Sequence, residues 1–208
     1  SGSQSPERVE RPENWGTGLL TQGSLLAANA HVDSSSPTLR GLLVHEKLHC
    51  KLRPTPPPDV PAITPPEPGA RTTRERYEVS HAADPFCNSC HRNFDPIGFT
   101  FEHFDNLGRY RADEGGLPID DSAELVLSLD GAPELVEGAT ELASSLAEDS
   151  RVASCVSDMI GLYALGFEER FHCLSPPMRN GLLQEGLSFQ EAFAQLAASP
   201  SLRVRSPD

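Results

Sequence analysis

Two cysteines and a histidine are spaced for the covalent attachment of haem. Residues 87–91 read CNSCH. In a C-x-x-C-H motif the two thiols add across the haem vinyl groups, and the imidazole binds the iron. Residues three or four apart share one face of a helix, so both sulfurs and the imidazole can meet one edge of the flat macrocycle. The motif therefore predicts one haem c, with Cys87 and Cys90 as covalent attachment points and His91 as the proximal iron ligand.

Two other interpretations of this motif stay open, a redox-active dithiol and half of a zinc site. Structural zinc takes four nitrogen or sulfur ligands, and the sequence has no second C-x-x-C or C-x-x-H. A thioredoxin-like dithiol follows a strand in an alternating β/α pattern, whereas proline and charged residues precede this motif. Asp84 is a suitable N-cap and Pro85 suits the first helical position, so we expect a helix to begin here. We favour haem attachment for these reasons.

The sixth iron ligand has four candidates, namely His81, His103, Met159 and Met178. We favour His81, because it ends the helix that leads into the motif, and we place Met159 second. In the alternative interpretation His81 only holds the loop through hydrogen bonds. Histidine ligation would give a lower reduction potential than methionine ligation.

Aromatic side chains follow the motif closely. Phe99 and Phe104, together with Phe101 and Leu107, offer an apolar surface before the turn at Gly108. Near a haem motif, Phe99 and Phe104 are candidates for packing against the haem. The alternative for both is an ordinary place in the hydrophobic core.

A second metal-binding motif lies upstream, on a predicted helix. Residues 45–49 read HEKLH, and H-E-x-x-H on a helix is the motif of zinc proteases, in which both imidazoles bind the metal. Lys47 puts a charge inside the motif, no further ligand segment is evident, and the helix runs into proline soon afterwards. We therefore interpret His45 and His49 as residues on a solvated or lightly packed face, without a catalytic metal.

Charge and hydropathy exclude several classes of function. The 208-residue chain carries a formal net charge of -13, and its basic residues are scattered, so a nucleic-acid partner is not expected. No apolar run approaches the ~18 residues that a membrane-spanning helix needs, so no membrane span is expected. The opening residues 1–5, SGSQS, resemble a trimmed start, so a targeting segment can be missing from this sequence.

The three cysteines outside the haem motif bear on the cellular compartment. Cys155 and Cys173 flank a short predicted helix and turn, and we predict a disulfide between them. A disulfide implies an oxidising compartment, periplasmic or secreted, which is also where c-type haem is attached. Cys50 would then be buried and inert, or paired with a cysteine in a missing part of a longer chain. The alternative is three free, buried thiols.

The remaining patterns predict a mainly α chain with at most one short β-hairpin. Residues 54–69 are rich in proline and form a stiff, extended strap. Strand-forming residues are confined to 117–130. Capping boxes open two helices, at Thr72–Glu75 and Ser188–Glu191. Helices are expected at about 38–52, 72–81, 133–147, 151–165 and 188–198.

Several stretches together resemble a known family. Residues 74–111, RERYEVSHAADPFCNSCHRNFDPIGFTFEHFDNLGRYR, and residues 115–125, GGLPIDDSAEL, resemble the planctomycete-type cytochrome C domain family of unknown function. Residues 17–61 resemble the front of the same domain. The tail, residues 151–173, is similar to the small helical domain that usually follows it.

The resemblance implies a cytochrome c-like helical haem domain at 16–115 and a C-terminal helical domain at 116–208. It implies a periplasmic or secreted haem protein, usually the C-terminal portion of a longer chain. Similar proteins also carry a histidine at the position of His81. They commonly have asparagine in place of His103, and their first helix lacks paired histidines.

Two functions from different classes follow. The domain is an electron-transfer module with a six-coordinate haem, whose partner is a redox protein or the remainder of a longer parent chain. Alternatively, it is an oxidase or peroxidase-like module with an open distal site. A single C-x-x-C-H argues against a self-sufficient two-haem peroxidase, and no catalytic residues are marked by spacing, so we favour electron transfer. A haem-free interaction or zinc-binding domain is the third hypothesis.

Overall fold

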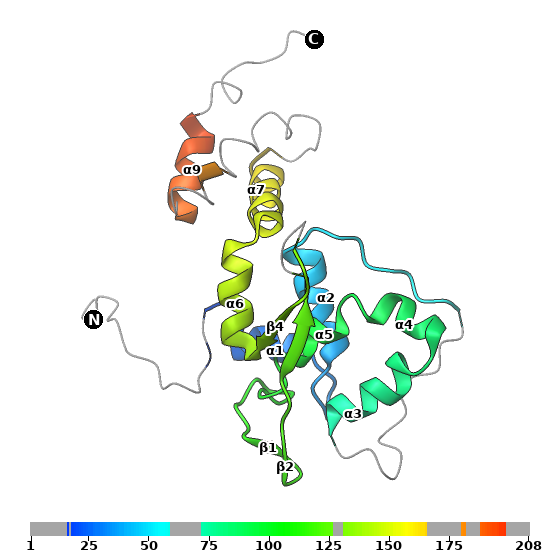
Figure 1. Cartoon of the computed structure of the whole chain (residues 1–208). Coiled ribbons are helices and arrows are strands. Elements are labelled where there is room, and N and C mark those ends of the chain that lie inside the picture. Colours follow the sequence, from blue (N-terminus) through cyan, green and yellow to red (C-terminus); the bar gives the residue numbers. More distant parts are fainter. Residues whose placement is uncertain are drawn as a thin grey trace, which may run out of the picture.

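A computed structural model describes residues 16, 18–58, 72–126, 131–165, 180–181 and 188–198. Helices form most of this part of the chain, as predicted, with two small antiparallel sheets beside them (Figure 1). Parts of the sequence-based predictions lie outside the described residues, among them Cys173, Met178, most of the proline-rich strap and residues 127–130 of the predicted strand segment.

The helices and strands have the following bounds. The helices are α1 (Gly23–Ala28), α2 (Pro37–Lys47), α3 (Thr73–Tyr77), the π-helical turn η2 (Glu78–Ala82), α4 (Pro85–His91), α5 (Asp95–Phe99), α6 (Gly138–Glu148), α7 (Ser150–Leu165) and α9 (Phe189–Ala198). The strands are β1 (Asp113–Glu114), β2 (Leu117–Pro118), β3 (Ser122–Leu125) and β4 (Glu134–Glu137). None of the described helices is long and apolar enough to span a membrane.

Two antiparallel strand pairs are present where at most one hairpin was expected. Strands β1 and β2 pair around Gly115 and Gly116, whose φ angles of 63° and 81° suit the tight turn of a two-residue hairpin. Strand β3 pairs with β4, with Ala123 opposite Val136. The predicted helix at 133–147 was therefore wrong over β4. Burial of Val136 against the core decides that segment, and the helix begins only at Gly138.

Local capping signals in the sequence are confirmed. Thr72 and Glu75 form the predicted capping box that opens α3, and Ser188 and Glu191 form the second one, which opens α9. The predicted helix at 38–52 is shorter, because α2 ends at Lys47 and the chain turns at Cys50, whose φ is 50°. These caps satisfy backbone N–H groups that a helix leaves without internal partners.

Two glycines bring α2 and α5 into backbone contact. A Cβ on Gly41 would lie 1.8 Å from the carbonyl oxygen of Phe94, and one on Gly98 would lie 1.9 Å from that of Pro37. Such distances leave no room for any side chain at either glycine. Helix α5 is therefore fixed against α2, and this contact positions the residues that follow the haem motif.

One hydrophobic cluster packs the larger part of the fold. It combines residues from α1, α2 and α5 with residues from β3, β4 and α6. The cluster therefore contains residues from both sides of 115/116, and the division into two domains there stays a prediction. Figure 1 shows α3 and α4 on the opposite side of α2 and α5 from α6. The cluster comprises Leu26, Val44, Ile97, Phe101, Phe104, Ala123, Leu125, Val136, Ala139, Leu142 and Leu146.

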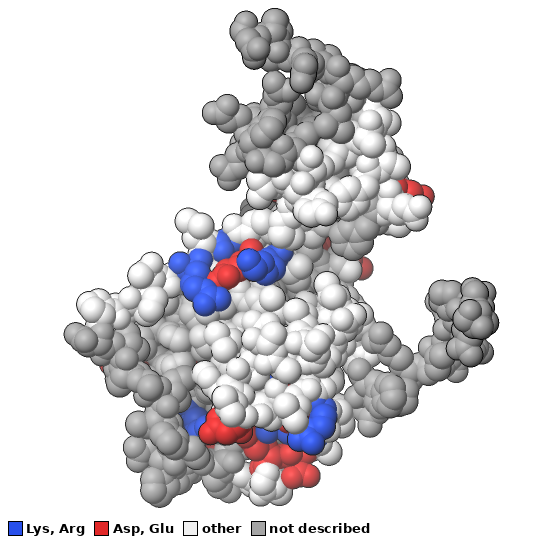
Figure 2. All heavy atoms as spheres, turned by 180° about the vertical axis from the view of Figure 1, so that it is seen from behind, with Lys and Arg blue, Asp and Glu red and all other residues white. Residues whose placement is uncertain are grey.

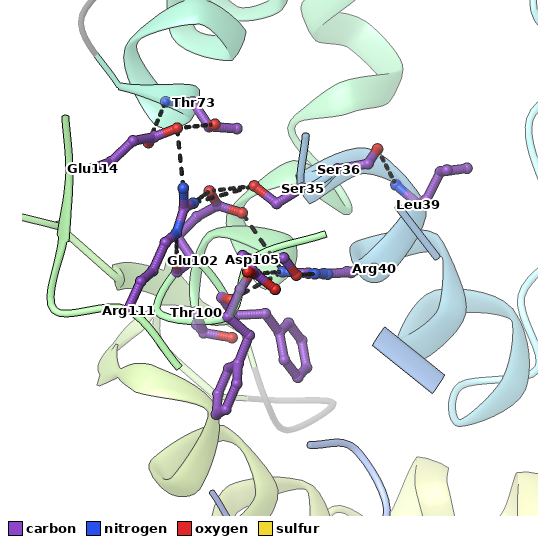
Figure 3. Close-up of polar contacts among 12 residues, drawn as sticks. Ser35, Ser36, Leu39, Arg40, Thr73, Thr100, Glu102, Asp105, Arg111 and Glu114 are labelled. Carbon is purple, nitrogen blue, oxygen red and sulfur yellow. Dashed lines mark hydrogen bonds and ion pairs between the residues drawn. The ribbon is translucent and has the colours of Figure 1, made fainter. Parts of the chain in front are cut away.

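Arg40 ties α2 to the turn after α5. Its side chain is 1% exposed, and its guanidinium donates to the backbone carbonyls of Phe101 at 3.0 Å, Phe104 at 2.6 Å and Asp105 at 2.5 Å (Figure 3). The carbonyls of Phe101 and Asp105 also accept from the backbone N–H groups of Phe104 and Gly108, so Arg40 adds a charged donor that connects all three carbonyls of this turn to α2. Arg40 is therefore an internal support for the 101–105 turn.

A buried carboxylate accompanies this arginine. Glu102 accepts from Ser35 and from Arg111, each at 2.9 Å, and lies 4.0 Å from Arg40. Burial raises the pKa of Glu102 to about 7, although Arg40, Arg111 and Ser35 pull it down.

On the face in Figure 2, most basic side chains lie beside acidic ones, with no continuous basic stripe.

A disulfide joins the end of α2 to the start of α7. Cys50 pairs with Cys155, with their Cα atoms 5.3 Å apart. The predicted pairing of Cys155 with Cys173 was therefore wrong. Proximity in sequence suggested that pairing, whereas the tertiary fold brings Cys155 against the chain that leaves α2. A disulfide as such was predicted, and it is present.

His49 and Asp149 make a second contact at this joint. The Nε2 atom of His49 lies 3.1 Å from an oxygen of Asp149, which also accepts from Arg151. His45, the other histidine of the H-E-x-x-H motif, is buried against the ring of Phe94. Neither belongs to a three-ligand cluster among the described residues, and both side chains pack within the fold rather than lie on a solvated face.

The stability of this joint should depend on pH. Burial, together with Arg151, lowers the pKa of His49 to about 4, although the carboxylate of Asp149 raises it. Between pH 4 and 6.5 the unfolded chain binds a proton at His49 that the folded chain does not, so stability falls as the pH falls through this window. We expect the free energy of unfolding to fall by about 3 kcal/mol over this window because of His49. Urea unfolding between pH 7 and 4 should show this loss in the wild type and not in His49→Gln; equal pH profiles would contradict it.

Candidate haem-binding site

Helix α4 presents the C-x-x-C-H motif at the surface. Asp84 caps the helix as predicted, because its carboxylate accepts from the N–H groups of Phe86 at 2.8 Å and Cys87 at 3.1 Å. Cys87 is half-buried and Cys90 is exposed, and both are free thiols. No residue of α4 is buried. The cysteines are therefore accessible for a reaction with a molecule outside the protein.

His91 is held by a buried carboxylate that lies four residues further on. The Oδ2 atom of Asp95 accepts from Nδ1 of His91 at 3.0 Å and from Nδ1 of His81 at 2.8 Å. The ring centroids of the two histidines are 3.7 Å apart. Burial alone would raise the pKa of Asp95, but hydrogen bonds from His81, His91 and Thr38 outweigh it and lower that pKa. Asp95 is therefore an ionised acceptor.

The donor set fits a c-type haem. Since Nδ1 of His91 donates to Asp95, Nε2 carries the lone pair that binds a metal. The two free thiols lie on the same short helix as this imidazole. Val79 on η2 and Phe86 on α4 are each 68% exposed, so the segment also offers apolar surface of the kind that a haem macrocycle contacts.

The structure places His81 beside His91. Ligands on opposite sides of one iron turn their Nε2 atoms toward it and their Nδ1 atoms away from each other. Here both Nδ1 atoms meet one oxygen of Asp95. His81 would have to leave Asp95 before it could act as the sixth ligand. Its observed hydrogen bond to Asp95 agrees with the alternative interpretation, in which His81 only holds the loop.

The other candidate ligands lie elsewhere. Met159 is 38% exposed on α7, which packs against α6, and Figure 1 shows α7 well apart from α4. His103 stacks on Tyr110 and bonds through Nδ1 to the carbonyl oxygen of Arg111 at 2.8 Å. Among the described residues, only His81, His91 and Asp95 form a cluster that could hold a metal ion.

The two phenylalanines proposed for haem packing are buried in the protein. Phe104 belongs to the hydrophobic cluster. Phe99 lies under the guanidinium of Arg74, whose Cζ is 4.7 Å from the ring centroid. This packing is what the alternative interpretation describes, an ordinary place in the interior.

Sequence reasoning missed Asp95 and Thr38. The signal for Asp95 was its spacing of four residues from His91, which places a carboxylate one turn away from an imidazole. Thr38 carries no such signal, because it lies 57 residues from Asp95, to which it donates at 2.6 Å.

Comparison with known proteins gives a match to a family model. Residues 16–114 match the family model described as PSCyt3, protein of unknown function (DUF1588). No curated protein and no solved structure matches the chain. The matched region includes α1 to α5 and therefore the whole Cys87–Asp95 segment.

Proposed function

We propose that this chain is a c-type cytochrome domain with one covalently attached haem for electron transfer, as the match of residues 16–114 to PSCyt3, a planctomycete-type cytochrome c family of unknown function, suggests. One observation carries the proposal. His91 has its Nδ1 atom held by a buried carboxylate, and two free thiols lie on the same helix. Haem, when bound, supplies a one-electron redox centre.

The proposal gives a role to each residue of the motif at 87–91 that would hold the haem. Cys87 and Cys90 would form the thioether bonds, and His91 would bind the iron as the proximal ligand. His81 would be the distal ligand after its release from Asp95. Met159, the second choice from the sequence, would first have to approach α4 from its place on α7. A distal position that stays open would instead favour the oxidase or peroxidase-like alternative.

Charge and redox context support the transfer role. The formal net charge of -13 favours a redox partner with a basic docking surface, because opposite charges steer association. The Cys50–Cys155 disulfide is typical of an oxidising compartment, which supports a periplasmic or secreted location. The redox partner is a separate protein or the remainder of a longer parent chain.

Replacing both motif cysteines tests the haem assignment. In a host that attaches haem c, the double variant Cys87→Ala/Cys90→Ala should lose all haem that survives denaturation, because no thioether bond can form. Ser89→Ala is the matched control, since it lies between the cysteines and leaves both thiols in place. Haem staining after denaturing electrophoresis measures the result. A stained band in the double variant would refute the assignment.

A second candidate function is a metal site in the haem-free chain. Ligand atoms of His81, His91 and Asp95 lie within 4.8 Å of one another, and two imidazoles with a carboxylate suit zinc. The haem-free double cysteine variant keeps these three residues. Zinc bound to it at one equivalent, and lost on a further His81→Ala change, would favour this candidate; no zinc uptake would remove it.

A further inference from the structure

The carboxylate of Asp95 is fixed at both of its oxygens. Thr38 on α2 donates its hydroxyl to Oδ1 at 2.6 Å, while His81 and His91 share Oδ2. The residue is 4% exposed, and it begins α5, whose backbone is locked against α2 through Gly98. The carboxylate therefore has a set position relative to the imidazole of His91.

We propose that Asp95 is the positioning residue of the haem site, and that it sets the reduction potential through His91. A carboxylate on Nδ1 fixes the tautomer and the ring orientation of a metal-binding histidine and raises the basicity of its other nitrogen. A more basic Nε2 stabilises the oxidised iron over the reduced iron. Asp95 thus lowers the potential of the haem. This inference rests on the haem assignment proposed above.

The hydrogen bond from Thr38 to Asp95 offers a second way to change the strength of the Asp95–His91 hydrogen bond. A hydroxyl that donates to one carboxylate oxygen withdraws charge from the other, so Thr38 weakens the acceptor that faces His91. Loss of the hydroxyl should strengthen the Asp95–His91 hydrogen bond. Loss of the carboxylate charge should weaken it. The two changes act on the same bond in opposite directions.

Redox titration of three haem-loaded variants tests the proposal. Asp95→Asn keeps the size of the side chain but replaces the carboxylate by a weaker acceptor, so the midpoint potential should become more positive than in the wild type. Thr38→Val is nearly the same size as threonine and should make the potential more negative. Glu148→Gln, an exposed change on α6 that removes the same charge, is the control and should leave the potential near that of the wild type.

The outcomes separate the inference from the haem assignment. Opposite shifts in Asp95→Asn and Thr38→Val support the inference, because a merely loosened site would move both potentials in one direction. An Asp95→Asn potential equal to that of Glu148→Gln, or shifts of one sign in both variants, would overturn it. If Asp95→Asn does not fold, Thr38→Val decides, and an unchanged potential there overturns the inference. A wild type without covalent haem would instead refute the proposed function.

Discussion

Replacing Cys50 and Cys155 together with serine is expected to lower the free energy of unfolding by about 4–5 kcal/mol. The disulfide closes a loop with a sequence separation of 105 residues, and a crosslink over such a length removes much of the conformational freedom of the unfolded chain. It also ties α7 to α2 at the joint where His49 meets Asp149. Denaturant unfolding of the oxidised protein would measure the loss.

The variant Cys173→Ser is the matched control for this prediction. It leaves the Cys50–Cys155 bond in place and should unfold at nearly the wild-type denaturant concentration. Peptide mapping without reductant should recover Cys50 joined to Cys155. A Cys173→Ser protein as unstable as the double variant, or a recovered Cys155–Cys173 peptide, would contradict the pairing.

Replacing Arg40 with methionine should destabilise the protein by about 3–5 kcal/mol, because it breaks a buried ion pair by removing one partner. The change leaves the Glu102 carboxylate without one of its neighbouring cations. It also removes the guanidinium donors to the carbonyls of Phe101, Phe104 and Asp105, of which those of Phe101 and Asp105 keep a backbone donor. Methionine fills a similar volume, so the effect reports on charge and hydrogen bonds more than on packing.

Arg109 provides the comparison for this second prediction. It pairs with the carboxylate of Asp105 at 2.8 Å, but its side chain is 72% exposed, and exposed ion pairs contribute about 1 kcal/mol or less. Arg109→Met should therefore unfold close to the wild type in urea. If Arg40→Met costs no more than Arg109→Met, the buried network does not support the 101–105 turn.

The local features of this fold were readable from the sequence. The capping box at Thr72, the N-cap at Asp84 and the second box at Ser188 use side chains whose hydrogen bonds close within three residues. Such contacts depend little on the rest of the chain. The mainly helical class followed from the same local signals.

The features that depend on distant contacts were not readable in this way. Cys155 had a near neighbour in sequence at Cys173, but only the packing of α7 against the end of α2 brings it to Cys50. The segment of β4 carries helix-forming residues, yet pairing with β3 overrides them. Thr38 reaches Asp95 because glycines let α2 and α5 touch.

The haem assignment is tested most directly by the optical spectrum of the wild-type protein made in a host that attaches haem c. We expect a covalent haem that survives denaturation, at one per chain, with sharp α and β bands after reduction by dithionite. Bands unaffected by carbon monoxide would indicate a six-coordinate, electron-transferring iron. A protein that folds under these conditions and carries no covalent haem would contradict the account.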